Sequence, residues 1–124
     1  YLDMLENEDL SRLSNDEVGD ILGQYCDGLC QIWGRNSGLA YYRSVSGRFP
    51  EWKTELETAA AALDACANYG GFLWSQGIGW VGDGLEKFRS KDGRKILADE
   101  GRRAMQKDRE AVEQFEKILE KENW

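Results

Sequence analysis

Residues 14–33 read SNDEVGDILGQYCDGLCQIW, and this stretch decides the fold class. Its apolar residues recur at steps of three and four, the spacing that places side chains on one face of an α-helix. These residues are Val18, Ile21, Leu22, Tyr25, Cys26, Leu29, Ile32 and Trp33. Ser14 and Glu17 have the pattern of a capping box, in which each side chain bonds the backbone N–H of the other residue. We therefore predict a helix over 15–33.

A second helical signal follows Pro50. Proline suits the first turn of a helix because it gives up no intrahelical hydrogen bond there. The apolar face that follows includes a run of four alanines, which raises the intrinsic helix propensity. These features predict a helix over 50–69 that ends at Gly70-Gly71. Shorter helical pieces are expected at 3–13, 39–46 and 83–89, with an extended connector as the alternative for 39–46.

The C-terminal part of the chain predicts one long helix over 94–122. Residues from Leu97 to Ile118 alternate steps of four and three along one stripe, with Asp108 as the polar misfit. The residues that widen this apolar face are Ile96, Met105, Val112 and Leu119. At about 1.5 Å per residue the helix is roughly 40 Å long. It therefore projects, packs against a second copy of the chain, or bends at Gly101.

The segment 70–84 resists assignment, because six of its fifteen residues are glycine. A helix with a small-residue face and a glycine-rich apolar loop both fit it. Residues 77–82, GIGWVG, match the G-x-G-x-x-G pattern, but a dinucleotide site also needs a preceding strand and a parallel sheet, which this chain does not predict. Residues 65–82 carry no charge, yet their glycines and polar residues favour a buried core segment over a membrane span.

Length and composition agree with a small helical protein. The chain has 124 residues, the usual size of one domain. Its single proline argues against a loop-rich all-β fold, and an apolar fraction of 41% argues against intrinsic disorder. We predict one all-α domain over 1–124: a small helical bundle with a long C-terminal helix and a glycine- and aromatic-rich segment before it.

Charge is unevenly distributed along the chain. The net charge of −7 disfavours sequence-independent binding to nucleic acid. Residues 1–34 hold eight acids and one base, whereas 87–109 hold nine bases and four acids, so their net charges are −7 and +5. The basic stretch faces the acidic N-terminal segment, forms a solvated helix face, or docks an anionic partner. The candidate docking residues are Arg94, Lys95, Arg102, Arg103, Lys107 and Arg109.

The absence of histidine excludes several mechanisms. The usual base for a serine or cysteine nucleophile is missing, and so are metal sites of the histidine–carboxylate kind. A carboxylate pair such as Glu51 and Glu55 is compatible with glycoside hydrolysis, but 23 acids in 124 residues make such pairs common by chance. We expect no catalytic residue, no metal and no cofactor; whether the chain is an enzyme is left open, with a non-enzyme favoured.

The three cysteines do not form a disulfide-rich pattern. Cys26 and Cys30 lie four residues apart on the predicted helix, a geometry that does not favour a bridge between them. Buried thiols in a reducing cytosol are the favoured interpretation, and a bridge from Cys66 to Cys26 or Cys30 in a secreted protein is the alternative. We expect a cytoplasmic protein, or a secreted one whose signal peptide has been removed.

Aromatic residues are concentrated between Trp33 and Trp80, where nine of the fourteen lie. A tryptophan-rich core is one explanation. An exposed surface of aromatic residues and arginines, the types that dominate interface hot spots, is the functional one. The candidate partner-binding residues are Trp33, Arg35, Tyr41, Tyr42, Arg43, Trp74 and Trp80.

These features lead to three functional hypotheses. The favoured one is a non-enzymatic protein-binding module, such as an inhibitor or immunity-type protein, that engages a protein partner through an acidic and aromatic surface. The alternatives are a secreted effector or toxin-like domain whose segment 65–82 engages a receptor or membrane, and a small carboxylate-based enzyme or ligand-binding protein. A homodimer through the C-terminal helix is compatible with all three, whereas nucleic acid is not expected as a partner and membrane contact is disfavoured.

Overall fold

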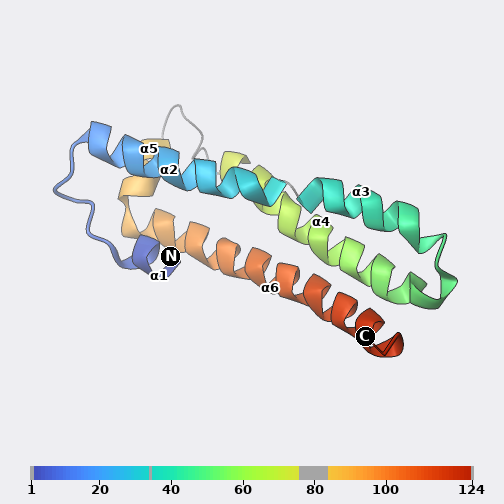
Figure 1. The fold of residues 1–124 in the computed structure, drawn as a ribbon. Coiled ribbons are helices and arrows are strands. Elements are labelled where there is room, and N and C mark those ends of the chain that lie inside the picture. Colours follow the sequence, from blue (N-terminus) through green and yellow to red (C-terminus); the bar gives the residue numbers. More distant parts are fainter. Residues whose placement is uncertain (1, 34, 76–83, 124) are drawn as a thin grey trace. The chain divides into compact units, whose positions relative to one another are not determined.

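The computed structural model describes residues 2–33, 35–75 and 84–123; for 26–33, 35–37 and 70–75 it describes the backbone alone. Within these ranges the chain forms six α-helices, one short 3-10 helix and no strand. The elements in chain order are α1 (Leu2–Asn7), α2 (Asn15–Trp33), α3 (Arg35–Ser46), η1 (Pro50–Trp52), α4 (Lys53–Ser75), α5 (Gly84–Arg89) and α6 (Lys91–Lys121) (Figure 1). The predicted all-α fold with a long C-terminal helix is confirmed.

The two helices with the clearest sequence signals form as predicted. The capping box of α2 is made: Ser14 Oγ accepts from the Glu17 N–H at 3.2 Å, and the Glu17 carboxylate accepts from the Ser14 N–H at 2.8 Å. The long helix α6 begins three residues earlier than 94, because Ser90 is its N-cap and accepts from the Gly93 N–H at 2.9 Å. At both helix starts, a serine side chain accepts a hydrogen bond from the backbone N–H three residues further along the chain.

Several predicted boundaries are wrong. α4 continues through Gly70-Gly71, because a glycine costs only about 1 kcal/mol relative to alanine in a helix and does not by itself stop one. α1 ends at Asn7, well short of 13, and the carbonyls of Glu8, Leu10 and Leu13 beyond it accept from arginine side chains. The piece at 39–46 is helical, so the extended connector is wrong, and the helix begins earlier, at Arg35.

The predictions for segment 70–84 lie only partly within the described residues. Up to Ser75 the backbone is helical and belongs to α4, which agrees with the helical alternative for that part. The glycine string at 77–82 lies outside the described residues. The short helix predicted at 83–89 is present as α5.

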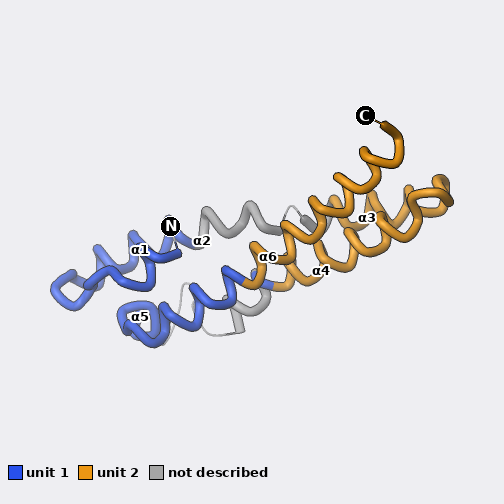
Figure 2. The backbone as a smooth tube through the Cα atoms, turned by 90° about the horizontal axis from the view of Figure 1, so that it is seen from below, with its two compact units in different colours: residues 1–32, 69–102 blue, residues 33–68, 103–124 orange. Residues whose placement is uncertain are grey.

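The helices group into two compact units (Figure 2). Unit 1 consists of residues 1–32 and 69–102, and unit 2 consists of residues 33–68 and 103–124. α4 and α6 each contribute one part to each unit. The expectation of one domain over 1–124 stays a prediction.

A buried tyrosine pair joins the helices of unit 1. The hydroxyls of Tyr25 on α2 and Tyr69 on α4 lie 2.7 Å apart, and both side chains are almost fully buried. Tyr69 donates to the Leu97 carbonyl on α6 at 2.9 Å, so Tyr25 is the donor to Tyr69. The Tyr25 ring also contacts Phe88 on α5, with 5.9 Å between ring centroids. Gly101 permits this approach, since a Cβ there would lie 3.1 Å from the Tyr69 hydroxyl.

Small residues dominate the core of unit 2. A buried cluster joins α4 and α6, and its members are Ala59, Ala62, Leu63 and Ala111. Half-buried Tyr42 of α3 and Phe115 of α6 pack against the cluster, with 4.7 Å between their ring centroids. Unit 2 is therefore a packing of α3, α4 and α6 around alanines, closed by two aromatic rings.

Candidate functional site

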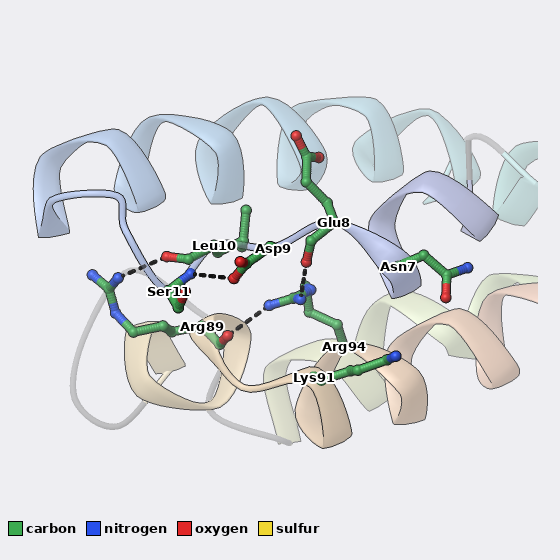
Figure 3. Close-up of a pocket in the computed structure, with 8 residues that line it drawn as sticks. All are labelled: Asn7, Glu8, Asp9, Leu10, Ser11, Arg89, Lys91 and Arg94. Atoms are coloured by element: carbon green, nitrogen blue, oxygen red, sulfur yellow. Dashed lines mark hydrogen bonds between the residues drawn. The ribbon is translucent and has the colours of Figure 1, made fainter.

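A hollow of about 310 Å³ opens in unit 1 beside the turn from α5 to α6 (Figure 3). Its lining residues are Asn7, Glu8, Asp9, Leu10, Ser11, Arg89, Lys91 and Arg94. A pocket with converging polar groups is the usual first candidate for a ligand site. The partners of its arginines decide whether those groups are available.

Arg94 is the buried member of this lining, with 2% of its surface exposed. Its Nε donates to the Leu5 carbonyl at 2.8 Å, and its Nη2 donates to the Glu8 carbonyl at 2.5 Å. Its Nη1 donates to the carbonyls of Phe88 and Arg89, at 2.9 and 2.6 Å. Burial lowers the pKa of Arg94, but arginine remains protonated in proteins. The charged group thus uses four hydrogen bonds to hold backbone carbonyls.

Arg89 of α5 binds the loop between α1 and α2 in the same way. Its Nη1 donates to the carbonyls of Leu10 and Leu13, at 3.1 and 2.7 Å. Its Nη2 donates to Asn15 Oδ1 at 2.6 Å. Figure 3 shows both arginines directed at the 8–11 segment. The two arginines hold the N-terminal loop in place, so we assign the hollow a structural role.

Within unit 1, part of the basic stretch forms ion pairs with the acidic N-terminal segment, which agrees with one of the three explanations for that part. Arg102 Nη2 lies 2.6 Å from Asp3 Oδ1 and 2.7 Å from Glu6 Oε2. Lys95 Nζ lies 2.8 Å from Asp99 Oδ2 and 3.8 Å from Glu6 Oε1. The hydrogen bond from Arg102 lowers the pKa of Asp3. The hydrogen bond from Lys95 lowers the pKa of Asp99.

The six residues of the candidate basic patch have different environments. They are Arg94, Lys95 and Arg102 in unit 1, and Arg103, Lys107 and Arg109 in unit 2. Arg94 lies in the interior, and Lys107 pairs with Glu110 at 2.6 Å. Arg109 is exposed and makes no ion pair within the described part of the chain. Much of this positive charge is therefore used inside the molecule, and docking of an anionic partner stays a prediction.

The candidate aromatic and arginine residues are described to different extents. Those whose side chains lie outside the description are Trp33, Arg35, Trp74 and Trp80. Tyr41, Tyr42 and Arg43 lie on α3 of unit 2. Tyr41 is 61% exposed, and its ring stands edge-on to Tyr42 with 5.4 Å between centroids. The structure therefore brings two of the predicted aromatic residues together at the surface of unit 2.

A row of exposed apolar side chains follows α6 through unit 2. Met105, Val112 and Leu119 are each about half exposed, at 51, 49 and 49%. They are seven residues apart, and seven residues make almost two whole turns of an α-helix, so the three side chains lie in line. The sequence pattern placed them on the apolar face of the helix, but the covered row is the neighbouring one, Ala104 and Ala111. The seven-residue spacing is their signal in the sequence, but the exposure itself is known only from the structure.

Aromatic rings connect this row to α3. Phe115 lies three residues after Val112 and four before Leu119, the spacings at which helical side chains are neighbours. Its ring packs on Tyr42, which contacts Tyr41. A chain of ring contacts thus links α6 to α3 within unit 2. We name the surface formed by Tyr41, Met105, Val112, Phe115 and Leu119 the α3–α6 face.

One member of the candidate carboxylate pair, Glu55, is held by a lysine of unit 2. Glu55 is 9% exposed, and its Oε1 accepts from Lys121 Nζ at 2.5 Å. This hydrogen bond lowers the pKa of Glu55, whereas a carboxyl group that acts as a general acid needs a raised one. Lys121 also donates to the Glu51 carbonyl at 3.4 Å. The arrangement links the start of α4 to the end of α6, which favours a structural role for Glu55.

Other site classes receive no support from the described residues. No helix in the described ranges is long and apolar enough to cross a membrane. Among the described side chains, no group of three or more acidic or cysteine residues is placed to hold a metal ion. Comparison of the chain with protein-family models, with curated proteins and with solved structures gives no match. The α3–α6 face is the feature from which we infer a function.

Proposed function

We propose that this chain is a non-enzymatic protein-binding module that docks a protein partner on the α3–α6 face. The observation that carries the proposal is the in-line row of Met105, Val112 and Leu119, each about half exposed on one helix. Single exposed apolar residues are ordinary on protein surfaces, whereas contiguous ones mark interaction sites. A protein partner would remove this row from water.

The composition of the face supports a protein partner. Apolar side chains form most of the face, and half-buried Asp108 lies between Met105 and Val112. The exposed charges of Arg109 and Glu116 border the face on one flank, as polar residues border the core of an interface. Exposed Tyr41 adds aromatic area of the kind that is enriched among energetically dominant contacts. The small size of the chain and its net charge of −7 favour an inhibitor or immunity-type protein.

A photoreactive side chain tests the face directly. p-Benzoylphenylalanine at position 112 lies on the face, and the same group at Gln106, an exposed position on another side of α6, is the matched control. In an extract of the source cells, irradiation is expected to attach a defined protein to position 112 and not to position 106. Excess wild-type chain should compete, and excess Val112→Glu chain should not. Equal labelling from both positions, or none from either, would contradict the proposal.

A further inference from the structure

We infer that the partner of the α3–α6 face is a second copy of this chain, bound with the two α6 helices antiparallel. The inference rests on the proposed function and names its partner. A face that binds its own copy must be complementary to itself under a two-fold rotation. Three properties of α6 meet this requirement. They are the spacing of the apolar row, the order of the charges on one side of it, and the burial of its other side within unit 2.

The apolar row has a centre of symmetry of its own. Val112 lies midway between Met105 and Leu119, so the row extends about 10 Å to each side at 1.5 Å per residue. When two such helices pack antiparallel with the two Val112 residues opposite each other, Met105 of one copy meets Leu119 of the other. Each exposed apolar side chain then gains an apolar neighbour. A repeat of seven residues is also the spacing that keeps such a row facing a partner helix.

The charges beside the row favour the antiparallel direction. Arg109 lies three residues before Val112 and Glu116 lies four residues after it, so both border the row on the same flank. Both are exposed, and neither makes an ion pair within the described ranges. In an antiparallel pair, Arg109 of each copy comes level with Glu116 of the other, which gives two attractive contacts. In a parallel two-fold pair this flank of each copy lies beside the covered flank of the other, so Arg109 and Glu116 do not meet and the two attractive contacts are not made.

The other flank of the row is already covered. Ala104 and Ala111 are buried within unit 2, and Phe115 packs on Tyr42 at the edge of the covered side. The exposed apolar part of α6 in unit 2 is therefore a strip along one helix. A second helix with the same spacing matches such a strip, and a two-fold pair closes on itself without leaving a further copy of the face exposed.

Sedimentation equilibrium of the purified chain tests the inference. The wild-type chain is expected to change from monomer to dimer as its concentration rises from about 1 μM to about 1 mM. Val112→Glu places two carboxylates at the centre of the pair and should raise the dimer dissociation constant by about a hundredfold or more. Gln106→Glu adds the same charge on another side of α6 and should leave the constant unchanged.

A milder substitution at the same position tests the inference if the Val112→Glu chain does not fold. Val112→Asn removes the central apolar contact without adding charge and is expected to raise the dissociation constant about tenfold. Far-UV circular dichroism checks that each variant keeps its helices. A folded Val112→Asn chain that dimerises as tightly as wild type would overturn the inference.

A charge-reversal cycle tests the direction of the helices. Arg109→Glu alone and Glu116→Arg alone each turn two attractive contacts into repulsive ones, so each is expected to weaken the dimer about tenfold. The double variant restores both contacts with their signs exchanged, and its dissociation constant should return to within about threefold of the wild-type value. A double variant that is as weak as the two single changes combined would overturn the antiparallel arrangement.

Different experimental results would overturn the inferred dimer and the proposed docking function. A wild-type chain that stays monomeric at about 1 mM, or a dimer that a folded Val112→Glu chain also forms, overturns self-association through this face. Cross-linking from position 112 to a protein other than this chain would then still uphold the docking function. The absence of any cross-link specific to position 112 would overturn both.

Discussion

The two units of this chain use the same long helix in opposite ways. In unit 1, the first part of α6 supplies Arg94 and Arg102, whose guanidinium groups bind the backbone carbonyls and carboxylates of the N-terminal segment. In unit 2, the second part of α6 buries a row of alanines and leaves Met105, Val112 and Leu119 in solvent. In unit 1 the polar groups of α6 are bonded to the N-terminal segment, whereas in unit 2 α6 keeps an apolar strip exposed.

The residues of α6 that stand out in the sequence are therefore not the ones that are available at its surface. The basic residues of α6 stand out in the sequence, yet in unit 1 they hold the chain together. Ile96 of unit 1 is also exposed, but the residues seven positions to either side are Arg89 and Arg103, so it forms no row. Within the described part of α6, the repeat of exposed apolar residues is confined to unit 2. Disrupting unit 1 should therefore cost stability, whereas changing the strip should alter binding.

Replacement of Arg94 is expected to have the largest effect on stability. Arg94→Met keeps a long side chain but removes four hydrogen bonds to backbone carbonyls. Because these bonds are charge-assisted and their loss leaves buried acceptors unpaired, the free energy of unfolding is expected to fall by about 4 kcal/mol. Urea denaturation measures the change in the free energy of unfolding. The control is Arg12→Met, at an exposed position in the same unit, which is expected to lower this free energy by less than about 0.5 kcal/mol. Equal losses in the two variants would show that these bonds do not hold unit 1.

A methyl group at Gly93 is expected to have the next largest effect. A Cβ at this position would lie 2.0 Å from the Lys87 carbonyl oxygen, so the turn between α5 and α6 would have to move, at a cost of about 3 kcal/mol. Gly19→Ala on α2 meets nothing within 4 Å and should instead stabilise the chain by about 0.5 kcal/mol or more. Thermal unfolding of both variants measures the contrast. A Gly93→Ala chain as stable as wild type would contradict the close turn that positions Arg94.

The tyrosine pair offers a smaller effect and a matched control. Tyr69→Phe removes the donor to the Leu97 carbonyl and the acceptor of Tyr25, which is expected to cost about 1–2 kcal/mol. Tyr41→Phe removes a hydroxyl from the exposed α3–α6 face and should change stability by less than about 0.5 kcal/mol. The free energies of unfolding in urea give both values. If Tyr41→Phe cost as much as Tyr69→Phe, the contrast between the two units would not hold.

The ion pairs of Arg102 should have the smallest effect, and one that depends on pH. Arg102 lowers the pKa of Asp3 in the folded chain, so folding favours the ionised carboxylate. This contribution is present above the unfolded pKa of about 3.9 and is lost as the pH falls through the lower folded value. The difference in urea midpoint between wild type and Arg102→Gln should be constant between about pH 7 and pH 5 and shrink below about pH 4. A difference that grows on acidification would contradict the pairing.

The helices could be predicted where a local signal was sufficient. Ser14 and Glu17 mark the start of α2, because a capping box is made by residues three positions apart. The roles of Arg89 and Arg94 could not be predicted, because all but one of their acceptors are backbone carbonyls, up to 89 residues away in sequence, which no side chain identifies. The early end of α1 at Asn7 was not predicted either.

The candidate site could be predicted only in part. Aromatic composition led to Tyr41 and Tyr42, which the structure places together on α3. The seven-residue spacing from Met105 to Leu119 was visible, but spacing does not tell which side of a helix is covered. That depends on the packing of Ala111 against α4, which is a tertiary contact. The sequence alone therefore does not separate the exposed row from the core face of the helix.

Nuclear magnetic resonance of the ¹⁵N-labelled chain at rising concentration tests the central contrast most directly. Amide shifts recorded from about 10 μM to about 1 mM report which part of the chain contacts a second copy. We predict that the shifts change along the outward side of α6 in unit 2, most strongly near Val112, and extend to Tyr41, while the amides around Arg94 stay constant. Changes around Arg94 with none near Val112 would contradict the account.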